Sequence, residues 1–320
     1  MTMATTLTGE SVEELFCRAV QLVTAEGYAV SPRGQETREI LDVRMTLSRP
    51  RARLVHLPPA RVLNPAFAVA EAVWILSGTD APWIYTYNDR LRQYADDGVL
   101  KGAYGPRMRR WNDRIDQLRR VVEILEEDPD SRRAVIQLYD PAQDAGGHRD
   151  VPCTLGYRFH IRHGRLHMST SMRGQDVWIG LPYDLFVTTV LHELVAGWLG
   201  VELGEYHHHV DSLHIYERDL HQATVMPSAS APAEMEPLTT PWNGFDELLA
   251  KVIGGAPTGH PGWDSVATTM RSYRAWKSSE FTLARQTAAQ VGGLLGDALD
   301  TWYQRLSARR TGTTASAGTR

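Results

Sequence analysis

The sequence contains only two cysteines, Cys17 and Cys153, in 320 residues. Two thiols cannot build the disulfide framework that stabilises many small secreted proteins, and their scarcity fits the reducing cytoplasm. The first residues, MTMATTLTGE, also lack the basic and then apolar segments of a secretory leader. We therefore expect no signal peptide and a cytoplasmic protein, in which Cys17 is a small buried side chain of the first helix.

Long runs of one charge and long apolar runs are missing as well. The chain has 34 basic and 38 acidic side chains, a net charge of −4, and no long run of Lys or Arg that could follow a nucleic-acid backbone. Its longest apolar helix candidate, residues 185–199, is interrupted by His192 and Glu193 and is too short to cross a bilayer. We expect neither nucleic acid nor membrane as a partner, so a bound anion would be met by a few placed arginines.

What is present is enough apolar material for a sizeable core. Hydrophobic residues make up 42% of the chain, which predicts one large α/β domain or two small ones. Residues 309–320, RRTGTTASAGTR, are small, polar and basic. We expect this tail to be disordered because it cannot contribute to a packed core.

The segment richest in chemistry covers residues 151–184, VPCTLGYRFHIRHGRLHMSTSMRGQDVWIGLPYD. Residues 156–162 and 165–172 alternate around an Arg-His-Gly-Arg turn, which predicts a β-hairpin. Four reactive or charged side chains flank it: Cys153, Arg173, Asp176 and Asp184. A thiol, an arginine and two carboxylates on one short hairpin indicate a site for a small anionic substrate.

Other charged residues stand in unusual contexts. Glu71 is the only charge in the apolar helix predicted over residues 64–76, and a buried glutamate with a raised pKa suits proton transfer; the alternative is that it faces water. Arg33 lies in a loop before a predicted strand, where it could reach an anion or simply be solvated. The adjacent Arg132 and Arg133 would point to opposite faces of a strand, so both could reach one substrate only through a bend or a partner subunit.

Three consecutive histidines, His207 to His209, suggest a metal at first sight. On the strand predicted over residues 205–216 they alternate between faces, and His192-Glu193 lacks the two-histidine spacing of a metalloprotease. We expect no metal. A cysteine hydrolase is a further alternative, but no histidine-asparagine partner pattern accompanies Cys153.

Taken in order, the motifs resemble those of the thymidylate synthases and their relatives, the pyrimidine-nucleotide hydroxymethylases. The resemblance covers about residues 10–225 and includes these segments: Arg33; Glu71 in Glu-x-x-Trp-x-Leu-x-Gly; Tyr104-Gly105; Asp130-Ser-Arg-Arg133; Pro152-Cys153; Arg173-x-x-Asp176-Val177; Gly180-Leu-Pro-Tyr183; and His214-Ile-Tyr216. It implies one catalytic domain over residues 1–308 with a thymidylate synthase-like fold. In that fold a large mixed sheet is flanked by helices, and the sheets of two subunits pack across a homodimer interface.

The resemblance also implies catalytic roles. Cys153 would be the nucleophile that adds to C6 of a pyrimidine ring, and its thiolate needs positive surroundings. Glu71 would handle protons and order water, with Tyr104 nearby. Asp184 would recognise the base. The one-carbon donor implied is 5,10-methylenetetrahydrofolate, which Asp176 and Glu71 would contact.

The remaining residues would bind the nucleotide. Arg33 and Arg173 would hold the 5′-phosphate from one subunit, and Arg132 and Arg133 would reach it from the other, because guanidinium groups match phosphate oxygens well. Three residues would lie near the sugar: Gly174, His214 and Tyr216. His214 and Tyr216 are two apart on a strand and so face the same way.

One departure from the synthases concerns the base. Asp184 stands where they carry an asparagine that pairs with uracil. An amide offers both a donor and an acceptor, whereas a carboxylate accepts from the cytosine amino group and from N3 if that is protonated. The aspartate is what the cytidylate hydroxymethylases of this family carry, so it predicts a preference for cytosine.

Other departures concern water and the sugar. No Trp lies between Trp83 and Trp111, where the synthases have one, and the polar tail differs from their apolar closing segment, so water would attack the C5 methylene. Gly174 replaces a serine, which opens space for a ribose 2′-hydroxyl. Thr154 replaces a histidine, and we have no account of that change.

The predicted function is 5-hydroxymethylation of CMP or dCMP, with a slight preference for CMP, using 5,10-methylenetetrahydrofolate and water and releasing tetrahydrofolate. A CMP enzyme would suggest nucleoside antibiotic or antimetabolite biosynthesis, and a dCMP enzyme would suggest modified DNA. The alternatives are a divergent thymidylate synthase methylating dUMP and a non-catalytic nucleotide- or RNA-binding protein on the same fold. Retention of both Cys153 and Glu71 argues against the latter.

Overall fold

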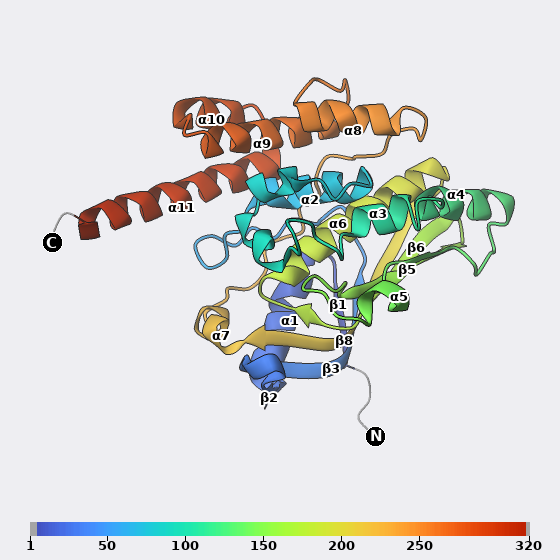
Figure 1. Ribbon diagram of the computed structural model, residues 1–320, viewed down its shortest axis with the longest axis horizontal. Helices are drawn as coiled ribbons and strands as arrows, with labels where there is room; N and C mark the ends of the chain where they lie inside the picture. The colour runs from blue at the N-terminus through green and yellow to red at the C-terminus, as the bar shows by residue number, and fades with distance from the viewer. Residues whose placement is uncertain (1–4, 318–320) are drawn as a thin grey trace.

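The computed structural model describes residues 5–317, which form a mixed sheet and a stack of helices (Figure 1). The strands are β1 Thr5–Gly9, β2 Tyr28–Val30, β3 Thr37–Leu47, β4 Val135–Gln137, β5 Thr154–Arg162, β6 Arg165–Met172, β7 Gln175–Asp176 and β8 Glu202–Tyr216. Among the described residues they form one sheet in the order β1-β3-β8-β6-β5-β4, with β2 beside β3 and β7 beside β8. Strands β3 and β8 are antiparallel whereas β6 and β8 are parallel, so the sheet is mixed, as predicted.

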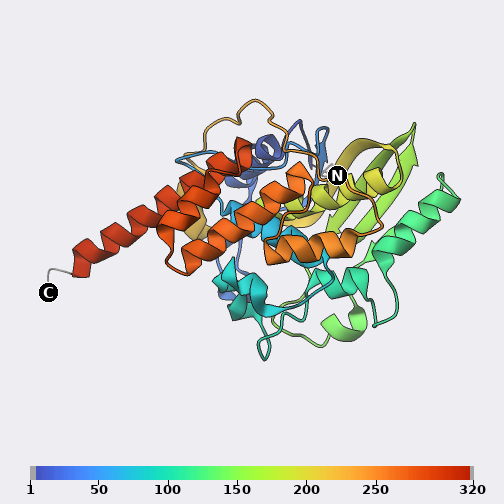
Figure 2. The ribbon, with the colours of Figure 1, turned by 90° about the horizontal axis from the view of Figure 1, so that it is seen from above.

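The helices lie in layers on the sheet. They are α1 Val12–Glu26, α2 Pro65–Leu76, α3 Tyr104–Arg109, α4 Gln117–Glu127, α5 Pro141–Asp144, α6 Gly180–Trp198, α7 Glu217–Ala223, α8 Phe245–Gly254, α9 Pro261–Lys277, α10 Phe281–Ala288 and α11 Gly293–Ala317. Figure 1 shows α2 and α6 between the sheet and the group formed by α8, α9 and α10. Seen from above, α11 extends away from the body of the molecule (Figure 2). No helix within residues 5–317 is both long and apolar enough to cross a membrane.

Local sequence signals explain where the first two long helices begin. The Ser11 side chain accepts a hydrogen bond from the Glu14 N–H at 3.1 Å and so caps α1. Asn64 caps α2 in the same way, and Pro65 fits the first turn because its missing N–H would have no partner there. Every residue of α2 is buried except Glu71, which is partly buried. Glu71 is therefore the one carboxyl group on an otherwise apolar helix.

The predicted hairpin is confirmed as β5 and β6. His163 and Gly164, the two central turn residues, have φ angles of 52° and 73°, the positive values that a tight hairpin turn needs. The strands then alternate strictly. Phe159 and Met168 are buried, whereas His160 and His167, which pair across the hairpin, stay partly exposed. One face of the sheet therefore belongs to the core, and the other carries polar side chains in contact with solvent.

The polar residues that interrupt the apolar sequence of α6 have partners inside the protein. Glu193 forms a buried ion pair with Arg53 and accepts a hydrogen bond from the Leu238 N–H at 2.9 Å. His192 contacts the carbonyl oxygen of Leu166 at 2.7 Å, and burial lowers its pKa to about 3, so it is neutral. These residues stabilise the packing of α6 on the sheet, because an unpaired buried charge would be costly.

Three boundaries differ from the sequence-based expectation. The sequence pattern predicts a helix from Trp111 to about Glu126, but α4 begins at Gln117, because Trp111 and Ile115 pair in a turn before the cap at Asp116. Helix α6 begins at Gly180, which places Asp184 in the early part of the helix. Helix α11 continues to Ala317, where a disordered tail was expected from residue 309. No proline interrupts it, and the last three residues lie outside the described part.

Candidate active site

One cavity brings together the reactive residues of the sequence analysis. It has a volume of about 150 Å³ and is lined by four predicted site residues: Glu71, Tyr104, Cys153 and Asp184. The rest of its lining is mainly apolar and includes Trp74, Ile75, Leu91, Leu100, Tyr157 and Val187. A water molecule occupies roughly 30 Å³, so the cavity has the volume of only a few water molecules. That is enough for one flat ring but not for a whole nucleotide.

A larger hollow of about 400 Å³ lies elsewhere, near the end of α2 and along α8. Its lining includes Ser77, Arg109, Asp246 and Ile253, and it contains none of the predicted site residues. The smaller cavity is the candidate active site because it combines a thiol with three carboxyl groups.

Cys153 immediately precedes β5, and Arg173 immediately follows β6 at the same end of the hairpin. The Arg173 N–H donates to the carbonyl oxygen of Cys153 at 2.9 Å. The guanidinium of Arg173 donates through Nε to the Pro152 carbonyl at 2.8 Å and through Nη2 to the Val151 carbonyl at 2.9 Å. Arg173 therefore fixes the backbone that presents the thiol.

The same neighbours set the charge around the thiol. Burial raises the pKa of Cys153 above its ordinary value, and Arg173 and Arg33 act in the opposite direction. Asp184 and Asp150 raise the pKa further. Without a bound ligand Cys153 is thus a thiol at neutral pH, and added positive charge or loss of a carboxylate would favour the nucleophilic thiolate.

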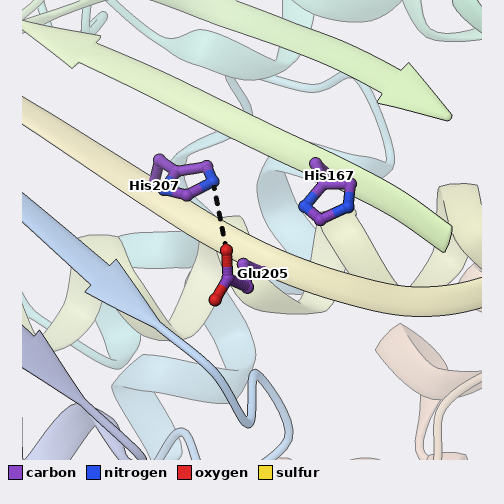
Figure 3. Close-up of side chains that lie close together, drawn as sticks. All are labelled: His167, Glu205 and His207. Carbon is purple, nitrogen blue, oxygen red and sulfur yellow. Dashed lines mark ion pairs between the residues drawn. The ribbon is translucent and has the colours of Figure 1, made fainter. Parts of the chain in front are cut away.

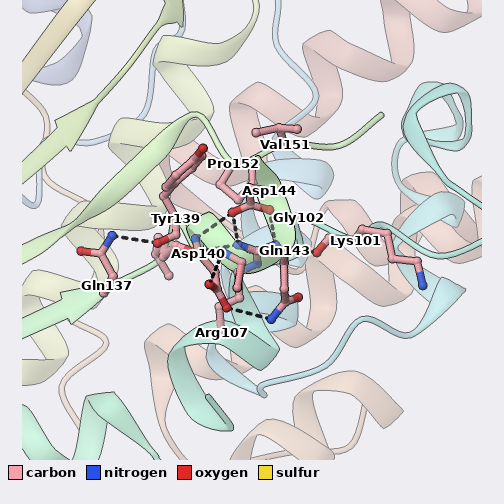
Figure 4. Close-up of polar contacts among 12 residues, drawn as sticks. Lys101, Gly102, Arg107, Gln137, Tyr139, Asp140, Gln143, Asp144, Val151 and Pro152 are labelled. Atoms are coloured by element: carbon pink, nitrogen blue, oxygen red, sulfur yellow. Dashed lines mark hydrogen bonds and ion pairs between the residues drawn. The ribbon is translucent and has the colours of Figure 1, made fainter. Parts of the chain in front are cut away.

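The loop that leads to Cys153, residues 145–152, follows a buried ion pair (Figure 4). Arg107 of α3 donates to both carboxylate oxygens of Asp144 in α5, at 2.7 and 2.8 Å. It also donates to the carbonyl oxygens of Leu138 and Lys101, at 2.7 and 2.9 Å. This bidentate contact ties three separate segments together, so the loop over residues 145–152 leaves from a fixed point.

Gly102 holds the other end of that loop. Its N–H donates to the Asp150 carboxylate at 3.0 Å, and a Cβ at this position would lie 1.9 Å from the Asp150 carbonyl oxygen. Only glycine allows this approach. Asp150 itself lines the cavity, and burial raises its pKa.

Asp184 ends a chain of buried polar side chains. Gln175 Nε2 donates to Asp184 Oδ2 at 2.8 Å, and Gln175 Oε1 lies 3.2 Å from His208 Nε2. His208 Nδ1 contacts the Tyr206 hydroxyl at 2.9 Å, and that hydroxyl lies 2.7 Å from Thr170 Oγ1. Because His208 is buried its pKa falls to about 3, so the neutral ring can donate only through one nitrogen. This series of hydrogen bonds fixes the orientation of the Gln175 amide, so that its Nε2 group donates to Asp184.

Two of the cavity carboxyl groups, Glu71 and Asp184, are weak acids. Burial raises the pKa of Asp184 to about 6, although the hydrogen bond from Gln175 opposes the shift. Burial and the charge of Asp184 raise the pKa of Glu71 well above its ordinary value. At neutral pH Glu71 can therefore carry a proton while Asp184 is mostly ionised, an arrangement suited to proton transfer.

Tyr104 is joined to the nucleophile segment. Its hydroxyl accepts a hydrogen bond from the Thr154 N–H at 3.2 Å. Burial, together with the charges of Cys153 and Asp184, raises the pKa of Tyr104 well above its usual range. The phenol therefore stays protonated beside the thiol, where it can donate to a reacting atom.

Apart from Glu71, the predicted sugar and folate residues are not among those that line the cavity. Asp176 accepts from the Trp178 and Ile179 N–H groups at 2.8 and 3.1 Å, which stabilises the turn into α6. His214 and Tyr216 project together from β8, with ring centroids 5.6 Å apart. A Cβ on Gly174 would lie 3.8 Å from the Ser212 carbonyl oxygen, an ordinary contact, so the backbone does not require glycine here.

The predicted phosphate-binding arginines fall into two groups. Arg33 has a left-handed backbone, with φ of 53°, on the turn before β3, and its charge acts on both Cys153 and Tyr216. Arg173 is adjacent to Cys153, as described. Arg132 and Arg133 are exposed before β4, and neither is among the charges acting on Cys153. In the described part of the chain, neither guanidinium has a hydrogen bond or ion pair.

Three lining or supporting residues were missed by the sequence analysis: Asp150, Gln175 and His208. Gln175 stands inside the Arg-Gly-Gln-Asp turn, and His208 is the middle member of the three histidines. Their alternation signalled that His208 would face the other way from its neighbours. Nothing in the sequence indicated that it would meet Gln175 across the β7–β8 pairing.

Comparison with known proteins shows which family the chain belongs to. A family model described as thymidylate synthase matches residues 14–236. The chain belongs to the thymidylate synthase family. Deoxyuridylate hydroxymethyltransferase of Bacillus phage SP01 is 37% identical over 228 residues, covering 67% of this chain and 59% of that protein. The protein of the same name from Pseudomonas phage M6 is 36% identical over 192 residues, covering 55% and 54%.

This thymidylate synthase family member therefore spans somewhat more than half the length of these phage relatives. The family prediction and the mixed α/β fold are confirmed. The relatives share the hydroxymethyltransferase part of the expected function by name, but their names specify deoxyuridylate and not cytidylate.

Proposed function

We propose that this protein is a folate-dependent pyrimidine-nucleotide 5-hydroxymethylase that acts on CMP or dCMP. The observation that carries the proposal is that Cys153 and Asp184, a nucleophile and a base-selective carboxylate, line one cavity with space for one ring. 5,10-Methylenetetrahydrofolate supplies the one-carbon unit, water supplies the hydroxyl group, and tetrahydrofolate leaves.

Cys153 begins the reaction by adding to C6 of the ring, which makes C5 carbanion-like and able to form the new carbon–carbon bond. The free thiol is a poor nucleophile because burial raises its pKa. Binding of a nucleotide beside Arg173 and Arg33 orders these positive groups around the site. Glu71, whose pKa is raised by burial and by the charge of Asp184, then serves the proton transfers at the ring, and Tyr104 donates to the reacting atoms.

Asp184 selects the base through its charge and its fixed neighbour. Gln175 already donates to Oδ2, so the remaining acceptor capacity of the carboxylate faces the ring. The cytosine amino group donates to it, and one proton is shared between the carboxyl group and N3, which the raised pKa of about 6 favours. Uracil would place its O4 acceptor against a carboxylate, and that contact is repulsive.

Gly174 supports a ribose substrate. The space that a Cβ would occupy is open, with Ser212 O and His214 Cε1 at 3.8 and 3.9 Å from the added atom. An extra 2′-hydroxyl can be accommodated beside His214, and a tolerant pocket discriminates little against one hydroxyl. CMP is therefore the slightly preferred nucleotide over dCMP.

The proposed working unit is a homodimer. Arg132 and Arg133 are exposed and have no ion-pair partner in the described residues, as side chains reserved for a second subunit would be. In the dimer they would reach the phosphate in the neighbour's site. Two guanidinium pairs, one from each subunit, would then surround the dianion.

A second candidate substrate is dUMP, because the phage relatives are named deoxyuridylate hydroxymethyltransferases. The decisive experiment compares kcat/KM for CMP, dCMP, UMP and dUMP with 5,10-methylenetetrahydrofolate, and weighs each product. A gain of CH₂O on a cytidylate is expected. Hydroxymethylation of dUMP alone would move the proposal to the second candidate. A gain of CH₂ with formation of dihydrofolate would mark a thymidylate synthase, and no turnover would mark a binding protein.

A further inference from the structure

Two histidines and a glutamate lie together on the solvent side of the sheet, outside the candidate active site. His167 comes from β6, and Glu205 and His207 come from β8 (Figure 3). One ligand atom from each side chain lies within 4.8 Å of the others, and His207 Nε2 is 3.9 Å from Glu205 Oε2. The two imidazole rings are nearly parallel, with an interplanar angle of 14°.

The sheet itself creates this grouping. Glu205 and His207 are two residues apart on one strand and so share a face. The pairing of β6 with β8 shifts between Leu166 and Met168, and the irregularity falls at His167. A Cβ on Gly204 would lie 2.5 Å from the Leu166 carbonyl oxygen and 3.1 Å from His167 Cε1. The irregular pairing and the missing Cβ therefore bring the His167 ring over the Glu205–His207 side of β8.

A neighbouring strand orients one of the rings. Thr46 of β3 pairs with His207, and its hydroxyl lies 3.2 Å from His207 Nδ1. A ring whose Nδ1 is engaged in this way leaves Nε2, the nitrogen facing Glu205, for coordination.

We propose that His167, Glu205 and His207 form a binding site for a divalent transition-metal ion of the Zn²⁺ type. Two imidazole nitrogens and one carboxylate oxygen are a donor set that Zn²⁺ accepts, and three protein ligands leave coordination positions for water. Ligand atoms in a tetrahedral zinc site are roughly 3.3 Å apart, so closure needs side-chain movements of about 1 Å. Glu205 is exposed and can make much of that movement.

The sequence analysis expected no metal because histidines on a strand alternate between faces. The alternation is real: His208 is buried while His207 and His209 are not. The proposed ion is bound by residues of two neighbouring strands, β6 and β8, and not by the three consecutive histidines of β8. In the homodimer proposed above, the sheets are expected to meet on this side, and the open coordination positions would lie toward the second subunit.

The test is direct metal binding by the full chain without a purification tag. Cys153→Ser is used as the background, so that the thiol cannot bind the ion, and the protein is first freed of metal with a chelator. Zn²⁺ is titrated by calorimetry, and Co²⁺ is followed by its visible absorption. We expect one ion per chain, and we expect His207→Ala or His167→Ala to weaken binding by at least about tenfold.

Two further variants make the result specific. Thr46→Val keeps all three ligands and should weaken binding by about tenfold through loss of the contact to Nδ1. His209→Ala, on the same strand but outside the group of three ligands, should leave the affinity within about twofold. Circular dichroism establishes that each variant is folded. The absence of stoichiometric binding, equal affinity in His207→Ala, or an equal loss in His209→Ala would each overturn the proposal.

Discussion

The two ends of the proposed nucleotide site are built differently. At the base end, Glu71, Cys153 and Asp184 line one cavity made by a single chain, and each is positioned by a named neighbour or a buried helix. At the phosphate end, Arg33 and Arg173 lie near the thiol, whereas Arg132 and Arg133 extend into solvent. The reacting groups are thus preorganised within the chain, whereas in the proposed homodimer part of the positive charge around the phosphate would come from the second subunit.

This difference has a physical basis. A carboxyl group and a thiol that exchange protons must be buried and held at fixed distances, which a closed core achieves. A cluster of four guanidinium groups around an empty site would repel one another. In the proposed homodimer two of them would come from a second subunit, and binding of the phosphate dianion would offset the repulsion among the four.

The largest expected effect tests the base end. Cys153→Ser should lower kcat by at least about a thousandfold with little change in nucleotide affinity, because the covalent step is lost and the binding contacts remain. Cys17→Ser should keep activity within about twofold, since Cys17 lies in α1 away from the cavity. Steady-state turnover measures kcat, and calorimetry measures the nucleotide affinity. Release of the C5 hydrogen at the normal rate in Cys153→Ser would contradict the nucleophile role.

The next effect concerns base selection. Asp184→Asn should shift the ratio of kcat/KM for cytidylate over uridylate by about a hundredfold toward uracil, because the amide can donate to O4. Gln175→Leu offers a matched perturbation: it removes the donor to Asp184 and should reduce the ratio by a smaller factor. Competition between CMP and UMP in one reaction measures the ratio. An unchanged ratio in Asp184→Asn would place base selection elsewhere.

The phosphate end can be tested by mixing subunits. Arg132→Ala with Arg133→Ala, and separately Cys153→Ser, should each abolish most activity. Unfolding and refolding the two variants together should restore about a quarter of wild-type activity, because half the dimers are mixed and each has one complete site. Activity that stays at the level of either variant alone would show that these arginines act on the site of their own chain.

The smallest effect is a stability difference with a defined pH dependence. Folding raises the pKa of Asp184 from 3.8 to about 6, so its protonated form stabilises the fold and that contribution is lost as pH rises through this range. The full shift corresponds to about 3 kcal/mol, and contact with water in the cavity reduces this to about 1 kcal/mol. Asp184→Asn should therefore be more stable than wild type at pH 7.5 and similar at pH 4, as measured by urea unfolding. A constant difference would contradict the assigned shift.

Sequence alone located the chemistry better than it located the supporting contacts. The motifs around Cys153 and Asp184 identified both members of the cavity, and the hairpin between Cys153 and Arg173 followed from its alternation and its Gly-containing turn. The chain from Asp184 through Gln175 to His208 was not predictable, because it depends on the register of β7 beside β8. The helix expected from Trp111 started late because a local turn competed with its apolar pattern.

The irregular pairing at His167 has a consequence for folding. Moving β6 by one residue along β8 would turn Leu166 and Met168 out to water and drive the intervening imidazole into the hydrocarbon interior, so misaligned forms are strongly disfavoured. Because Arg173 lies directly after this strand, the same alignment determines where the guanidinium meets the sulfur-bearing segment. Correct alignment of β6 on β8 is therefore required for the guanidinium to hold the segment that presents the thiol.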